Sequence, residues 1–227
     1  MDKFAAREFY TVVIGGSLLS TLAGFINAAV LTGSFHVAVT HVTGSLTRLG
    51  SSLATANWPS AGQVSGLTLC FFLGSATAGA TIDSTRFQLG RSYGIALLVE
   101  AAILVLAWVF FNVGHPAFGS AAAAYACGLQ NAFCTGYSGA VLRTTHMTGI
   151  TTDLGILFGQ IIARNPRVES WKIKVFGPLW IGYLVGGILG TWGTLAWGDN
   201  AILVPAVILC MAGVFYLTWG PAREARE

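Results

Sequence analysis

The stretch THVTGSLTRLG at residues 40–50 recurs as THMTGITTDLG at residues 145–155, and seven of the eleven positions are identical. Both copies, named here the Thr-His-x-Thr-Gly phrases, are polar in a chain of 227 residues that is 54% hydrophobic and 9% charged. The copies differ in the sign of one charge, because Arg48 in the first occupies the place of Asp153 in the second. A repeated phrase of this length predicts that the chain is built from two related halves.

The composition indicates an integral membrane protein, because a soluble domain usually has about a quarter of its residues charged. Six apolar stretches have roughly the 20 residues that a membrane-spanning helix needs. They cover residues 9–32, 61–82, 92–113, 117–137, 174–197 and 200–220. The net charge of +3 is spread along the connecting segments, so no nucleic-acid partner is expected. The four cysteines form no CxxC pair, so no disulfide framework, zinc site or cofactor is predicted.

The repeat extends upstream of both phrases and divides the chain. The aligned stretches are GFINAAVLTG at 24–33 and GLQNAFCTG at 128–136, with Gly24 opposite Gly128 and Asn27 opposite Asn131. The predicted repeats cover residues 1–113 and 114–227, with short polar segments at 34–58 and 138–164. We expect the two repeats to form a single membrane domain rather than two independent domains.

The distribution of Lys and Arg favours one topology for these repeats. Basic residues lie at both chain ends, between the second and third apolar stretches, and after the second polar segment. If the polar segments fold back without crossing the membrane, all four basic regions lie in the cytoplasm, as the positive-inside rule requires. The alternative, a parallel arrangement of four plus four spans, places Arg86 and Arg91 outside.

The re-entrant reading therefore predicts an all-α polytopic membrane protein with six transmembrane helices, two re-entrant half-helices and cytoplasmic N- and C-termini. Each repeat then has three spans, so the second repeat is inverted relative to the first. Many transporters share this arrangement, with broken helices that meet near the bilayer midplane.

The two phrases are the candidate solute site. Thr40, Thr43, Thr145 and Thr148 are expected to be N-caps of short helices that begin at the centre of the membrane. Two opposed helix N-termini favour a carboxylate or another small anion. In each phrase His, Gly and a charged residue recur at i, i+3 and i+7 and share one helix face. The predicted substrate-binding residues are Asn27, Thr40, His41, Thr43, Gly44, Asn131, Thr145, His146, Thr148 and Gly149.

Three charged residues inside the apolar body have two interpretations each. Arg48 and Asp153 are predicted either to form a central ion pair that clamps the repeats or to act in transport, because intramembrane charges are costly unless paired or functional. Glu100 stands alone in IALLVEAAILVLAW, at residues 95–108. We expect it to pair with Arg48 or an imidazole or to serve in proton coupling, with an interhelical hydrogen bond as the structural alternative.

Small residues four apart predict close helix packing in both repeats. Gly182, Gly186 and Gly190 form one such row, and Gly62 and Gly66 repeat its spacing in the corresponding helix of the first repeat. Rows of this kind let helix backbones approach each other closely. We expect internal packing, and a homodimer interface remains the alternative.

Four segments carry a resemblance to a known family: AGFINA, HVTGSLTRLG, GLQNA and RTTHMTGITTDLG, the last at residues 143–155. With Arg in the first phrase and Asp in the second, the chain resembles the YoaK-like family of small bacterial inner-membrane proteins over nearly its whole length. The resemblance implies a multi-pass protein of the bacterial cytoplasmic membrane. It implies no substrate, because the family is a domain of unknown function.

The residues favour a small membrane transporter for an anionic or polar solute. We expect no enzymatic activity. Its expected partners are the lipid bilayer and the solute, and proton coupling is one option. The alternatives are an aquaporin-like channel with paired half-helices, a non-transport scaffold or sensor, and an intramembrane serine protease. The last rests on GYSG at residues 136–139, which matches the GxSG of rhomboid-type proteases. A four-residue match is weak evidence, because such motifs arise often by chance.

Overall fold

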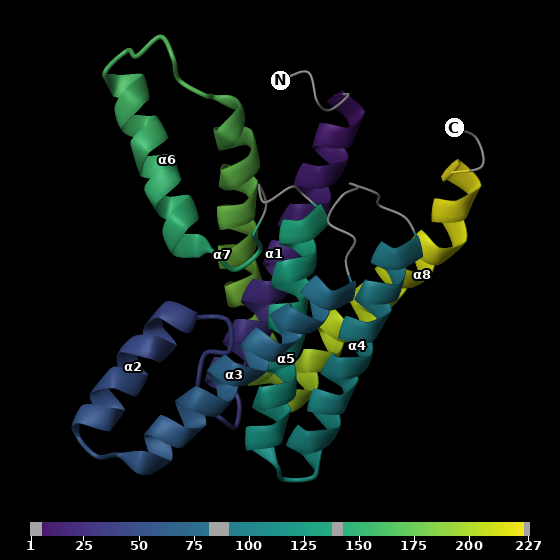
Figure 1. Ribbon diagram of the computed structural model, residues 1–227. Helices are drawn as coiled ribbons and strands as arrows, with labels where there is room; N and C mark the ends of the chain where they lie inside the picture. Colours follow the sequence, from purple (N-terminus) through teal and green to yellow (C-terminus); the bar gives the residue numbers. More distant parts are fainter. Residues whose placement is uncertain (1–5, 82–90, 138–142, 225–227) are drawn as a thin grey trace.

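The computed structural model describes residues 6–81, 91–137 and 143–224, and every regular element in these ranges is a helix. In chain order the elements are α1 Ala6–Thr32, α2 Val42–Ala54, α3 Trp58–Thr81, α4 Arg91–Asn112, α5 Pro116–Tyr137, α6 Met147–Ile162, α7 Trp171–Trp197, the 3-10 helix η1 Gly198–Ile202, and α8 Leu203–Glu224 (Figure 1). The prediction that the chain is a helical membrane protein is confirmed. Six long helices fall on the six apolar stretches, and the short helices α2 and α6 fall within the two polar segments.

Four helical stretches in the described ranges are long and apolar enough to cross a membrane. They are Phe9–Thr32, Trp58–Thr81, Ser92–Asn112 and Trp171–Thr218, and the last contains both α7 and α8. Helix α5 is outside this set. It packs against α3 and α4, and its residues Ala123, Ala124 and Ala126 have no exposed surface. A helix surrounded by protein needs small side chains for packing, so its composition is less lipid-like.

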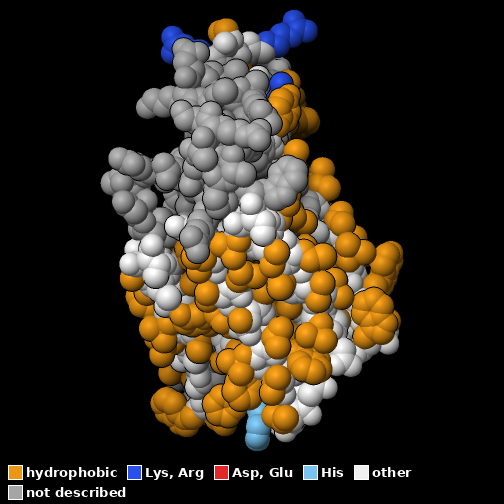
Figure 2. All heavy atoms as spheres, turned by 90° about the vertical axis from the view of Figure 1, so that its right-hand side faces the viewer, with side chains coloured by type: hydrophobic (Ala, Val, Ile, Leu, Met, Phe, Trp, Pro, Cys, Tyr) orange, Lys and Arg blue, Asp and Glu red, His pale blue; other side chains and the backbone are white. Residues whose placement is uncertain are grey.

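The outer surface of the described part is largely hydrophobic. Large apolar side chains stand exposed, with Leu195 at 78%, Ile14 at 68% and Trp58 at 66% of their full exposure. Figure 2 shows hydrophobic side chains over most of the described part of one face, with Lys and Arg gathered at one end. Soluble monomers rarely expose continuous apolar surface on this scale, whereas a lipid-facing surface requires it.

The two repeats exchange helices, because α1 packs mainly against α7, and α3 packs mainly against α5. A β-carbon added at Gly24 in α1 would lie 2.2 Å from the carbonyl oxygen of Tyr183 in α7. A β-carbon added at the aligned Gly128 in α5 would lie 2.0 Å from the carbonyl oxygen of Phe71 in α3. The same close backbone approach thus occurs once at each crossing.

A second pair of glycines repeats this correspondence. A β-carbon at Gly186 of α7 would lie 1.9 Å from the Thr21 carbonyl oxygen, and one at Gly74 of α3 would lie 2.1 Å from the Tyr125 carbonyl oxygen. Such distances are impossible for a real side chain, so both helix crossings depend on glycine. The two crossings are therefore built from matching contacts in the two repeats.

The glycine rows partly follow the sequence-based expectation. Gly182, Gly186 and Gly190 of α7 all face α1, which agrees with internal packing. Gly62 and Gly66 of α3 have no atom near the position of an added β-carbon, so the expectation that they form the matching row is wrong. Gly74 takes that role, because an added β-carbon there would meet the backbone of α5.

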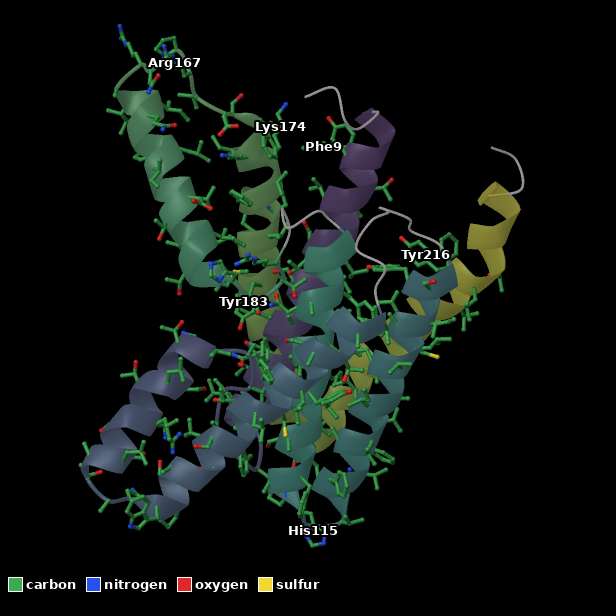
Figure 3. The ribbon with its side chains drawn as sticks, in the orientation of Figure 1. Phe9, His115, Arg167, Lys174, Tyr183 and Tyr216 are labelled. Atoms are coloured by element: carbon green, nitrogen blue, oxygen red, sulfur yellow. The ribbon has the colours of Figure 1, made fainter. Side chains whose placement is uncertain are left out.

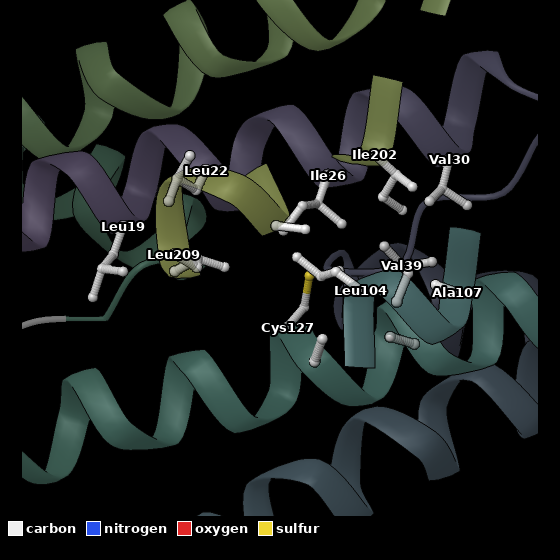
Figure 4. Close-up of a cluster of buried hydrophobic side chains, with 14 of the residues drawn as sticks. Leu19, Leu22, Ile26, Val30, Val39, Leu104, Ala107, Cys127, Ile202 and Leu209 are labelled. Carbon is white, nitrogen blue, oxygen red and sulfur yellow. The ribbon is translucent and has the colours of Figure 1, made fainter. Parts of the chain in front are cut away.

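The hydrophobic core lies where α1, α4, α5 and α8 meet. Leu22 and Ile26 from α1, Leu104 from α4, Cys127 from α5 and Leu209 from α8 contribute buried side chains (Figure 4). This core fixes the long helices, while α2 and α6 lie at the periphery and pack on α3 and α7 respectively. The half-helices are consequently held mainly by their first turns and by one neighbouring helix each.

Candidate solute-binding site

The half-helices α2 and α6 begin close to the same level, near the middle of the long helices, and run toward opposite ends of the molecule (Figure 1). Their N-cap residues are His41 and His146, and neither N-terminus has a side-chain cap. The expectation that threonines cap these helices is therefore wrong. Because the first amides of a helix have no partner within it, both first turns present N–H groups to whatever lies between them.

The glycine of each phrase makes room for the histidine of the same phrase. A β-carbon at Gly44 would lie 2.9 Å from His41 Nδ1, and one at Gly149 would lie 2.2 Å from His146 Nε2. Each imidazole thus folds over the first turn of its own half-helix, three residues ahead. This accounts for the fixed His-x-x-Gly spacing in both copies: a larger residue at the glycine would displace the ring.

Asn27 and Asn131 hold the segments that lead into the half-helices. The Oδ1 atom of Asn27 accepts hydrogen bonds from the backbone N–H groups of Val39 and Thr40, at 2.9 and 3.0 Å. The Oδ1 atom of Asn131 accepts one from the backbone N–H of Thr145 at 3.3 Å. The two asparagines therefore occupy corresponding positions and fix where each phrase begins.

Side-chain hydrogen bonds attach each half-helix to the long helix that follows it. Ser52 of α2 donates to Ser60 of α3 at 2.9 Å, and the indole N–H of Trp180 in α7 donates to the hydroxyl of Thr151 in α6 at 3.1 Å. A further bond of 2.7 Å joins the hydroxyls of Thr40 and Tyr183.

A cavity of about 750 Å³ lies at the first turns of the two half-helices. Eight of the ten predicted binding residues line it, and they come from corresponding places in the two repeats: Asn27, Thr40, His41, Thr43, Asn131, Thr145, His146 and Thr148. Gly44 and Gly149 do not line it and instead accommodate the imidazoles. In Figure 3 Tyr183 lies at this level, midway between Arg167 at one end and His115 at the other.

The cavity also has lining residues that were not predicted. Arg143, Tyr183, Phe71 and Ser75 are the main examples. Tyr183 and Phe71 are the residues whose carbonyl groups contact Gly24 and Gly128, so the helix crossings place them beside the phrases. Arg143 lies two residues before Thr145 in the sequence, and its place in the cavity could have been predicted from this proximity to the second phrase.

The structure does not bring Arg48 and Asp153 together, and the expected central ion pair is absent. Each is the seventh residue of its half-helix, about 9 Å along the axis from the first residue. Helices α2 and α6 diverge from the cavity (Figure 1), and the side chains of Arg48 and Asp153 are both exposed. Among the described residues, the ion pair that does form joins Lys172 and Glu169.

Glu100 does not line the cavity. It is buried in α4, and its Oε1 atom has no hydrogen-bond partner among the described residues. Helices α2 and α4 do not contact each other, so Glu100 does not pair with Arg48. Ser138 of the GYSG motif lies outside the described residues. In the described part, no group of three or more His, Cys, Asp or Glu residues is arranged to hold a metal ion.

These features define a class: a helical membrane protein with a cavity lined by polar residues at the first turns of two short helices. The chain belongs to the family described as "Protein of unknown function (DUF1275)", whose model matches residues 15–215. This family includes the YoaK-like proteins, so the resemblance drawn from the phrases is confirmed. No curated protein matches the chain, and no solved structure matches it.

Proposed function

We propose that the chain is a small-solute transporter of the bacterial cytoplasmic membrane, and that the cavity between α2 and α6 binds the solute. The observation that carries the proposal is the pairing of the two phrases around one polar cavity in an otherwise apolar body. Backbone that is not hydrogen-bonded within a helix is tolerated at membrane depth only where it is buried in protein or lines a cavity. Two uncapped half-helix N-termini facing one cavity meet this condition.

The topology that we propose has six crossings, two re-entrant half-helices and inverted repeats. The matched contacts of the α1–α7 and α3–α5 crossings support the repeat. The first residues of α1, the last residues of α8 and the connection between α6 and α7 lie at one end of the molecule (Figure 1). Arg167 and Lys174 lie at this end, whereas the α4–α5 connection with His115 lies at the other (Figure 3). The positive-inside rule then assigns the Arg167 end to the cytoplasm.

The helix pairing also indicates which parts would move during transport. Because α1 is closely packed with α7, and α3 with α5, the rigid units are cross-repeat pairs rather than the repeats in sequence order. Helix α6 would move with α1 and α7, and α2 would move with α3 and α5. Rocking of these two units would open the cavity alternately to each side, which is the usual mechanism for inverted-repeat transporters.

A passive channel is the second candidate. Two half-helices that meet at their N-termini are also the design of aquaporin-type pores, in which a continuous path passes the meeting point. The two candidates predict different kinetics. An unlabelled solute on the far side accelerates flux through an alternating-access transporter, and it has no such effect on a pore.

The experiment uses the purified protein in proteoliposomes, with radiolabelled acetate, glycine and glycerol as probes. We expect uptake of at least one probe, acceleration by the same unlabelled probe on the far side, and loss of uptake in His41→Ala and His146→Ala. His115→Ala is the matched control, because its histidine lies in the α4–α5 connection, far from the cavity. Uptake without acceleration would identify a channel. Absence of uptake of all three probes, with folded protein in the membrane, would refute both candidates and favour the scaffold alternative.

A further inference from the structure

The charged side chain that lines the cavity is positive, and no negative side chain of the described residues balances it there. Arg143 lines it, and no Asp or Glu among the described residues does so. The arginine forms no ion pair with a described residue. A guanidinium group is always charged in proteins, and the Arg143 side chain is exposed rather than buried. Among the described residues, the cavity therefore carries a positive charge that no acidic side chain neutralises.

The polar groups around Arg143 are also mainly donors. The first amides of α2 and α6 have no side-chain cap, so they remain available to an acceptor. The Oδ1 acceptors of Asn27 and Asn131 are already occupied by the backbone of the phrases. Aligned helix dipoles add partial positive charge at both N-termini. The electrostatic preference of the cavity is therefore for an acceptor with negative charge.

The charge belongs to one repeat alone. Arg143 precedes Thr145 by two residues, and the residue two before Thr40 in the first repeat is Ala38. The phrases are otherwise closely matched around the cavity, so the arginine is the main difference between its two sides. An anion would be drawn toward the second repeat, where the guanidinium and the first turn of α6 lie together.

From these observations we infer that the solute is a small oxyanion, with Arg143 as the residue that selects for its negative charge. The planar guanidinium forms paired hydrogen bonds with carboxylates and other oxyanions, which a lysine or an amide cannot reproduce. The inference rests on the proposed function, which requires only that the cavity binds a small solute. It adds the chemical class of that solute and a residue that the phrases do not contain.

The test measures thermal stabilisation of the purified protein by acetate, lactate, nitrate and inorganic phosphate, and by the neutral analogues acetamide and lactamide. A ligand that binds the folded state raises the unfolding temperature, and at a given concentration a tighter ligand raises it more, with the logarithm of its affinity. We expect at least one anion to stabilise the protein, and its neutral analogue to have no effect. In Arg143→Gln the affinity should fall about 10-fold or more, as expected for loss of hydrogen bonds to a charged group. Arg143→Lys should retain part of the affinity.

The matched control is Arg48→Gln, which removes an equal charge from a side chain that is outside the cavity. Its anion affinity should equal that of the unmodified protein. If acetamide or lactamide binds as tightly as the corresponding acid, or if Arg143→Gln binds the anion unchanged, the inference is refuted while the solute cavity stands. If no compound stabilises the protein and no probe is transported, the proposed function fails and the inference fails with it.

Discussion

The replacement of Gly186 by alanine tests one of the close helix contacts of the described chain. The added β-carbon would lie 1.9 Å from the carbonyl oxygen of Thr21, whereas ordinary contact begins at 3.4 Å. Helices α1 and α7 would have to separate by about 1.5 Å, which removes a large part of the dispersion energy along their contact. Overpacking of this kind costs about 1–3 kcal/mol, and sometimes more. Alanine has a higher helix propensity, by about 1 kcal/mol, which offsets only part of this.

We therefore expect Gly186→Ala to lower the free energy of unfolding by about 2 kcal/mol, or the unfolding temperature by about 4–8 °C. The adjacent Gly187→Ala is the matched control, because nothing lies within 4 Å of its added β-carbon. It should be neutral or slightly stabilising. The assay is thermal unfolding in one detergent at a fixed heating rate, followed by tryptophan fluorescence. Equal loss of stability in both variants, or no loss in Gly186→Ala, would contradict the packing described for α1 and α7.

Three further predictions concern the site and the buried acid. Asn27→Ala should destabilise the protein more than Asn131→Ala, by about 1–3 kcal/mol, as measured by thermal unfolding. The loss of Asn27 leaves two backbone N–H groups without hydrogen bonds of 2.9 and 3.0 Å, whereas the loss of Asn131 removes one backbone bond of 3.3 Å. Tyr183→Phe removes the 2.7 Å bond to Thr40, so we expect a loss of about 1 kcal/mol in the same assay and weaker solute binding. Glu100→Gln should change stability by less than about 1 kcal/mol, because no cation among the described residues is paired with the carboxyl group, whereas a large loss would reveal an ionic partner.

Much of the fold could be read from patterns along the chain. The apolar stretches gave the long helices, because a run of about 20 apolar residues is stable at membrane depth chiefly as a helix. The repeated phrases gave the position of both half-helices and eight cavity-lining residues, because matching sequences fold into matching local structures. The histidine and glycine of each phrase were correctly linked by their spacing, although the glycine receives the imidazole rather than a ligand.

Contacts between distant segments could not be predicted in the same way. The crossing of α3 with α5 depends on Gly74 rather than on Gly62 and Gly66, because the depth at which two helices cross is set by both partners. The expected pairing of Arg48 with Asp153 assumed that corresponding residues lie close to the symmetry axis. In the structure only the first turns of α2 and α6 line a common cavity, and the two helices diverge beyond it.

The sequence by itself determined that this is a helical membrane protein with a polar phrase that occurs twice. These properties follow from composition and from interactions between residues that are near each other in the chain. The tertiary structure decided that the phrases share one cavity, that Tyr183 and Arg143 join them there, and that Glu100 does not. These facts depend on how the helices are rotated and where they cross, which is fixed by close packing between surfaces from different parts of the chain.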